Sequence, residues 1–147
     1  MQALRQLRLR TKCESCVNKC CSQPYDWIFL TSREICRLET SSGLSKDEFV
    51  VEQRNANNGH VFLTLSLPCR FLDPKTGQCT VYESRPLVCR LFPFYPEPLT
   101  GYATLLPVQC GDNLKLLDSN SRDGWGLKDF EQDIRQWLSE LWREAKT

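Results

Sequence analysis

The chain carries CESCVNKCC at residues 13–21, which places four cysteines within nine positions. Thiolates separated by two residues, as in Cys13 and Cys16, can meet at one metal ion because the turn between them directs both side chains to the same side. Iron–sulfur loops also place several cysteines within about ten residues. Adjacent thiols such as Cys20 and Cys21 reach one tetrahedral ion only with backbone strain. The pair is therefore better suited to two irons of one cluster or to two neighbouring sites.

Four further candidate cysteines lie downstream: Cys69, Cys79, Cys89 and Cys110. Nine, nine and twenty residues separate successive members of this group. Such wide spacing is weak evidence when taken alone, because buried cysteine is common in protein cores. Each of these cysteines is expected at the end of a secondary-structure element, where a folded core can bring distant ligands together. Two four-cysteine sites are one arrangement, and one site with a structural or redox-active remainder is another. The candidate metal ligands are Cys13, Cys16, Cys20, Cys21, Cys69, Cys79, Cys89 and Cys110.

Two residues that often bind metals are set apart from this group. Cys36 falls within a predicted helix and has no partner at ligand spacing, so we expect it to be a small core residue. His60, the single histidine, follows a turn and precedes a strand, and we interpret it as solvated. With one histidine available, thiolates must dominate any metal site, and soft thiolate ligands suit zinc or iron–sulfur.

Composition and charge narrow the class of protein. A chain of 147 residues fits one compact domain, which we expect to span residues 1–147 with its core at 13–110. The net charge of +1 gives no indication of a nucleic-acid partner. Apolar runs are too short to cross a bilayer, and residues 1–12 carry four basic side chains without the apolar segment of a secretory signal. We interpret these basic residues as a solvated tail or a helix face.

The cysteine count also indicates a compartment. Nine cysteines cannot all pair within one chain, and a secreted disulfide scaffold would need an export signal. In a reducing cytoplasm the same cysteines are better explained as metal ligands. We therefore expect a cytoplasmic protein with an unknown redox or protein partner, and neither a nucleic acid nor a membrane as partner.

Short elements are predicted between the cysteines, which gives the fold class α+β: a small single domain with few short strands and helices wrapped around a cysteine-ligated centre. Capping residues, alternating hydrophobicity and turn residues define the elements. They are a helix at 31–38, a helix begun by Ser45, a turn at 57–59, a strand at 61–67, a hairpin at 69–82 with Asp73 in its turn, a short helix begun by Ser84 and carrying Cys89, and a last strand at 102–108.

The clearest helix is predicted at about 127–144, where apolar residues recur on one helical face. We expect this C-terminal amphipathic helix to cover the cysteine core. Docking of a partner is the alternative, with Trp137 and Trp142 as its anchor.

Arg85 and Arg90 flank Cys89 and are candidate cofactor-binding residues. Basic side chains beside thiolates can balance their charge and donate hydrogen bonds to sulfur. Solvated surface charges are the alternative interpretation. Pro86 and Pro93 are interpreted as residues that bracket the short helix.

Several ordered blocks between residues 13 and 110 resemble the CxxCxxCC zinc- or iron-chelating family, also called YkgJ-type cysteine-cluster proteins. Beyond the opening cysteines, the blocks are IFLTSREI at 28–35, GLSKDEF at 43–49, PCRFLD at 68–73, GQCTVYE at 77–83 and RPLVCRLFP at 85–93. The resemblance implies that the eight cysteines named above are the ligands of a zinc or iron–sulfur site. The first block departs from the family pattern, since three residues rather than two separate Cys16 from Cys20.

The function predicted from these observations is an iron–sulfur protein, of the 4Fe–4S type, in electron transfer or redox sensing. A zinc-stabilised structural or interaction module is the alternative. A metal-dependent enzyme of unknown substrate is a third hypothesis, which needs an open coordination position. The sequence shows no Ser/His/Asp set and no phosphate loop, so no catalytic residue is assigned.

Overall fold

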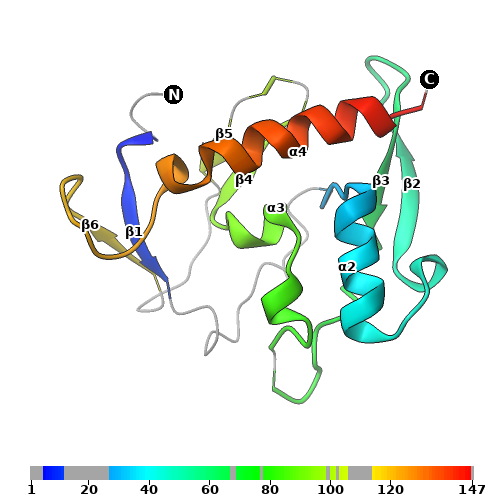
Figure 1. The fold of residues 1–147 in the computed structure, drawn as a ribbon, viewed down its shortest axis with the longest axis horizontal. Helices are drawn as coiled ribbons and strands as arrows, with labels where there is room; N and C mark the ends of the chain where they lie inside the picture. Colours follow the sequence, from blue (N-terminus) through cyan, green and yellow to red (C-terminus); the bar gives the residue numbers. More distant parts are fainter. Residues whose placement is uncertain are drawn as a thin grey trace.

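The computed structural model describes residues 5–11, 27–66, 69–76, 78–98, 100–101, 103–105 and 114–146. Within these ranges the chain forms short helices and three two-stranded antiparallel sheets, which confirms the α+β class (Figure 1). The elements are β1 (Arg8–Thr11), α2 (Ser32–Ser42), η2 (Lys46–Glu48), β2 (Val50–Arg54), β3 (Val61–Leu65), η3 (Tyr82–Ser84), α3 (Leu87–Arg90), β4 (Phe94–Pro96), β5 (Ala103–Leu105), β6 (Leu114–Leu117), η5 (Leu127–Phe130) and α4 (Glu131–Glu144).

Helix α4 runs along one side of the molecule, from the β1–β6 sheet to the β2–β3 sheet (Figure 1). The predicted helix at 127–144 is confirmed, with a 3-10 turn, η5, as its first part. Trp137 and Leu141 are buried because the apolar stripe faces the core, whereas Trp142 is 36% exposed. The two tryptophans therefore do not form a joint exposed anchor.

Helix α2 begins after Thr31, whose hydroxyl accepts a hydrogen bond from the Glu34 backbone, and Glu34 completes a capping box. It extends four residues beyond the predicted end at Leu38 and ends at Ser42. Gly43 then takes a φ of 75°, the left-handed conformation that favours glycine after a helix.

The prediction of a helix after Ser45 is wrong beyond its first turn. One 3-10 turn, η2, follows Ser45, and the chain then enters β2, which pairs antiparallel with β3. Val50 and Val51 are β-branched, and pairing of β2 with β3, which falls within the strand predicted at 61–67, overrides the local helix start.

Arg8 and Arg10 belong neither to a solvated tail nor to a helix face, and Lys12 lies outside the described residues. Arg8 and Arg10 lie on β1, which pairs with β6, and they form ion pairs with Asp129 and Asp123. Arg5 pairs with Glu131. Strand β5 falls within the predicted strand at 102–108, but β6 follows it, so β5 is not the last strand.

In the part of the chain that the structure describes, every helix is too short or too polar to cross a bilayer.

Candidate metal centre

Cys69, Cys79 and Cys89 are the candidate ligands that the structure describes. Cys89 is buried, and the other two are half-buried. All three pack in or against the same hydrophobic core, although they come from two separate segments. The remaining candidates lie outside the described residues: Cys13, Cys16, Cys20, Cys21 and Cys110.

Cys69 and Cys79 lie on a closed loop. The Leu72 amide donates to the Cys69 carbonyl over 3.3 Å, and Leu72 forms an antiparallel bridge with Cys79. The hairpin predicted at 69–82 is therefore confirmed in part: its arms meet at this bridge and where the Thr80 amide donates to the Phe71 carbonyl, whereas Tyr82 begins η3. The loop fixes the backbone of both cysteines against each other.

The turn of this loop is held by Asp73. Its carboxylate accepts a hydrogen bond from the Lys75 amide over 2.9 Å, and its own amide donates to the Gln78 carbonyl over 2.8 Å. The predicted turn role of Asp73 is confirmed, because Asp in such turns bonds the backbone two residues ahead.

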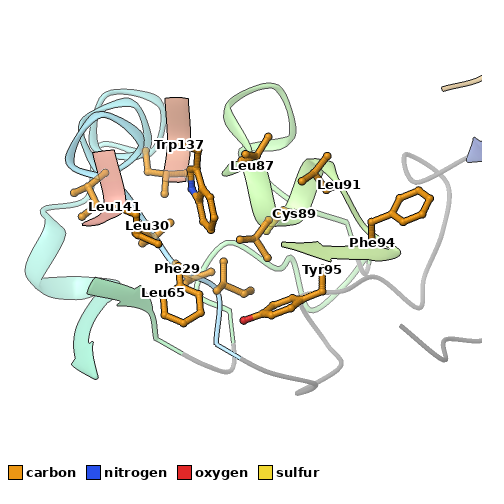
Figure 2. Close-up of a cluster of buried hydrophobic side chains, with 14 of the residues drawn as sticks. Phe29, Leu30, Leu65, Leu87, Cys89, Leu91, Phe94, Tyr95, Trp137 and Leu141 are labelled. Carbon is orange, nitrogen blue, oxygen red and sulfur yellow. The ribbon is translucent and has the colours of Figure 1, made fainter. Parts of the chain in front are cut away.

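Cys89 lies on α3 and belongs to the hydrophobic core (Figure 2). Figure 2 shows its side chain among Leu87, Tyr95 and Trp137, which come from α3, β4 and α4. A bare thiolate in such apolar surroundings is costly, and a bound metal cation would offset that cost. The position suits either a neutral thiol or a metal ligand.

The described residues do not complete a metal site by themselves. Among them, no group of three or more His, Cys, Asp and Glu side chains could hold a metal ion. A site that includes Cys69, Cys79 or Cys89 therefore needs donors from the segments outside the described ranges. The thiols on the described core fit zinc or iron by their chemistry, because both metals bind soft thiolates.

The start of α3 differs from the sequence prediction. Ser84 belongs to a separate 3-10 turn, η3, and Pro86 is the N-cap residue rather than part of the first turn. The prediction that Ser84 caps this helix and that Pro86 lies in its first turn is therefore wrong, and the proline side chain cannot accept a hydrogen bond. The Leu87 amide donates instead to the carboxylate of Glu34, over 2.6 Å.

Glu34 is the residue that sequence reasoning missed. The capping-box pattern at Thr31 and Glu34 was visible in the sequence, but it accounts only for the start of α2. The contact of Glu34 with Leu87 joins residues 53 positions apart, which no local pattern reveals.

Arg85 and Arg90 have different surroundings. The Arg85 guanidinium lies 3.8 Å from the centre of the Tyr82 ring, and its Nε donates to the Tyr82 carbonyl over 3.0 Å. Arg90 is half-buried, and burial lowers its pKa, while the nearby charges of Glu34 and Asp133 partly oppose this shift. The Arg90 Nε makes no hydrogen bond within the described residues. It is therefore a donor that a sulfur ligand could use, whereas Arg85 is already held by Tyr82.

The prediction that Cys36 is a core residue is wrong. Cys36 is exposed on α2, beside Arg33 and Arg37 in a shallow surface pocket. The reason is helical geometry: Ile35 and Leu38 are buried, and a rotation of about 100° per residue turns the position after Ile35 outward.

His60 is half-buried rather than freely solvated. Its ring centre lies 5.2 Å from that of Trp142 in an edge-to-face arrangement, and 6.4 Å from that of Phe62. Its Nδ1 is buried without a hydrogen-bond partner among the described residues. Aromatic packing, which the sequence pattern does not indicate, explains this position.

Comparison with known proteins matches residues 12–113 to the model of the family described as "CxxCxxCC: Putative zinc- or iron-chelating domain". The chain belongs to this family. The CxxCxxCC match covers all eight candidate ligands, and the family description names zinc or iron chelation without deciding between the metals.

Among the curated proteins that this CxxCxxCC protein resembles is "Uncharacterized protein MJ0661" from Methanocaldococcus jannaschii. The two are 30% identical over 88 residues, which cover 58% of this chain and 46% of the relative. The chain thus spans about half the length of the curated relative. No solved structure matches the chain.

Proposed function

We propose that this protein binds an iron–sulfur cluster, of the 4Fe–4S type, through its cysteines and acts in electron transfer or redox sensing. The observation that carries the proposal is that Cys69, Cys79 and Cys89, from two separate segments, lie in or against one hydrophobic core. Thiolates are the ligands of such clusters, and a dry, apolar surround is one of the factors that set their reduction potential.

The adjacent cysteines favour a cluster over a single ion. Cys20 and Cys21 can serve different irons of one cluster, whereas both reach one tetrahedral ion only with strain. Eight candidate thiolates would be enough for two four-cysteine centres of either kind. When bound, a cluster of this kind supplies one-electron transfer.

The chain's own residues would then hold and tune the centre. Cys69, Cys79 and Cys89 would act as ligands together with donors from 13–21 and Cys110. Arg90 follows Cys89 in the sequence, and its Nε, which has no hydrogen-bond partner among the described residues, would donate to sulfur and offset negative charge.

A zinc-stabilised structural or interaction module is the second candidate, and the sheets favour it. Each sheet of the described chain has two strands, and an isolated pair of strands is marginally stable in water. Metal binding that contributes directly to folding would stabilise such a fold.

The remaining expectations complete this proposal. The protein acts as one domain in a reducing compartment, the cytoplasm, where thiols persist as ligands. Its partner is an unidentified redox partner or other protein rather than a nucleic acid, since a net charge of +1 gives no indication of a basic nucleic-acid-binding surface.

The test is purification without oxygen, followed by measurement of iron, zinc and acid-labile sulfide together with the visible spectrum. The proposal predicts a brown protein with iron and sulfide in about equal amounts, as in a 4Fe–4S cluster. A colourless protein with stoichiometric zinc and no sulfide would establish the second candidate instead.

A further inference from the structure

One buried carboxylate joins three helices of this protein. Glu34, on α2, is 5% exposed. Its Oε1 accepts hydrogen bonds from the Thr31 amide over 3.0 Å and from Trp137 Nε1, on α4, over 2.9 Å. Its Oε2 accepts from the Leu87 amide, at the start of α3, over 2.6 Å. The two oxygens therefore bond different helices: Oε1 accepts from donors at the start of α2 and on α4, and Oε2 accepts from the donor at the start of α3.

Helix α3 depends on this contact more than the other helices do. It spans Leu87–Arg90, a single turn, and its N-cap residue Pro86 offers no side-chain acceptor. One turn is too short to be stable by itself, because helix nucleation is unfavourable. Beside its own backbone bonds, the burial of its apolar side chains and the bond from Leu87 to Glu34 hold it in place.

Cys89 lies two residues after Leu87 on the same turn. The position of its sulfur relative to the other thiols therefore follows the position of the α3 backbone. A ligand whose backbone shifts relative to its neighbours binds metal less tightly, as variants of groups that orient ligands show.

We propose that Glu34 is a positioning residue for the metal centre, which fixes the turn that carries Cys89 by accepting the Leu87 amide. The inference rests on the proposed function, because it takes Cys89 as a metal ligand. Glu34, which completes the capping box of α2, would thus have a second role: it would position the candidate ligand on α3.

Two substitutions of Glu34 isolate the contact. In Glu34→Gln the carbonyl oxygen can serve the donors at Oε1, and the amide nitrogen then faces the Leu87 amide, donor against donor. In Glu34→Asp the negative charge near Arg90 is kept, but the carboxylate is one methylene shorter and withdraws from Leu87. Both variants lose the bond to α3.

Trp137→Phe is the matched control. It removes the indole donor from Glu34 and leaves a gap in the core, so it destabilises the fold, while the bond between Glu34 and Leu87 remains. A purely structural role of Glu34 would give all three variants metal release in proportion to their loss of stability.

The experiment uses the full chain loaded with Zn²⁺ alone and measures the rate of metal transfer to an excess of a colorimetric chelator. The urea midpoint of each variant is measured in parallel. We expect Glu34→Gln and Glu34→Asp to release Zn²⁺ about 10-fold faster than wild type. We expect Trp137→Phe to lower the urea midpoint with a release rate close to that of wild type. If Glu34→Gln does not fold, the comparison of Glu34→Asp with Trp137→Phe decides.

Three results would overturn the inference. If both Glu34 variants release Zn²⁺ no faster than Trp137→Phe does, Glu34 acts only through the stability of the fold. Fast release in Glu34→Gln with normal release in Glu34→Asp shows that charge, not position, matters. Wild-type protein that binds neither Zn²⁺ nor iron overturns the proposed function, and this inference with it.

Discussion

Helices α3 and α4 both pack on the core of this protein, but different interactions form them. Helix α4 has fourteen residues and an apolar stripe that buries Trp137 and Leu141. Helix α3 has four residues, a proline at its N-cap and a hydrogen bond from Glu34 on another helix. The longer helix is specified largely by its own sequence, and the short one by contacts from far along the chain. The short helix carries the candidate ligand Cys89.

The largest effect is expected where the two helices meet. Trp137→Ala removes a side chain that is 1% exposed and takes a donor from Glu34. We expect the free energy of unfolding to fall by about 3–5 kcal/mol, measured by urea denaturation.

Trp142→Ala is the control on the same helix. Trp142 is 36% exposed, and its loss should cost clearly less than that of Trp137. Equal losses would contradict the assignment of Trp137 as the core residue of α4.

A smaller effect is expected at the cap of α2, which supports Glu34. Thr31→Ala removes the hydroxyl that accepts from the Glu34 amide, and we expect a loss of about 1 kcal/mol in the free energy of unfolding. Ser32→Ala, at the exposed neighbouring position, should change it by less than about 0.5 kcal/mol. A larger effect at Ser32 than at Thr31 would refute this account of the cap.

The smallest effect tests the local stability of α4. Arg135 is exposed in the middle of the helix, so Arg135→Gly should cost about 0.5–1 kcal/mol through helix propensity alone. Arg135→Ala should leave the free energy of unfolding unchanged or slightly raised. Neither variant should change the metal content. A loss of metal in either would contradict the view that α3, and not the exposed face of α4, positions the candidate ligand.

The difference between the helices also explains what the sequence could predict. The range of α4 followed from its repeating apolar positions, and the start of α2 from Thr31 and Ser32, either of which can cap a helix. The cap of α3 could not be predicted, because Leu87 and Glu34 are 53 residues apart. The exposure of Cys36 could have been predicted, since the buried residues Ile35 and Leu38 define the inner face of α2.

The candidate site was predictable in part for the same reason. The loop that carries Cys69 and Cys79 followed from its turn residues, and the turn at Asp73 confirms it. The packing of both cysteines on the same core as Cys89 depends on long-range contacts that local patterns do not contain. The same holds for the aromatic contacts of His60.

The most direct test of the central claim, that thiols on this core hold the metal, is the metal content of Cys79→Ala beside Cys36→Ala. Both variants remove one thiol, one from the half-buried loop and one from the exposed face of α2. Each is purified without oxygen, and iron, zinc and sulfide are counted per chain. The account predicts that Cys36→Ala keeps the metal content of wild type and that Cys79→Ala loses it. Metal retained in Cys79→Ala, or lost in Cys36→Ala, would contradict it.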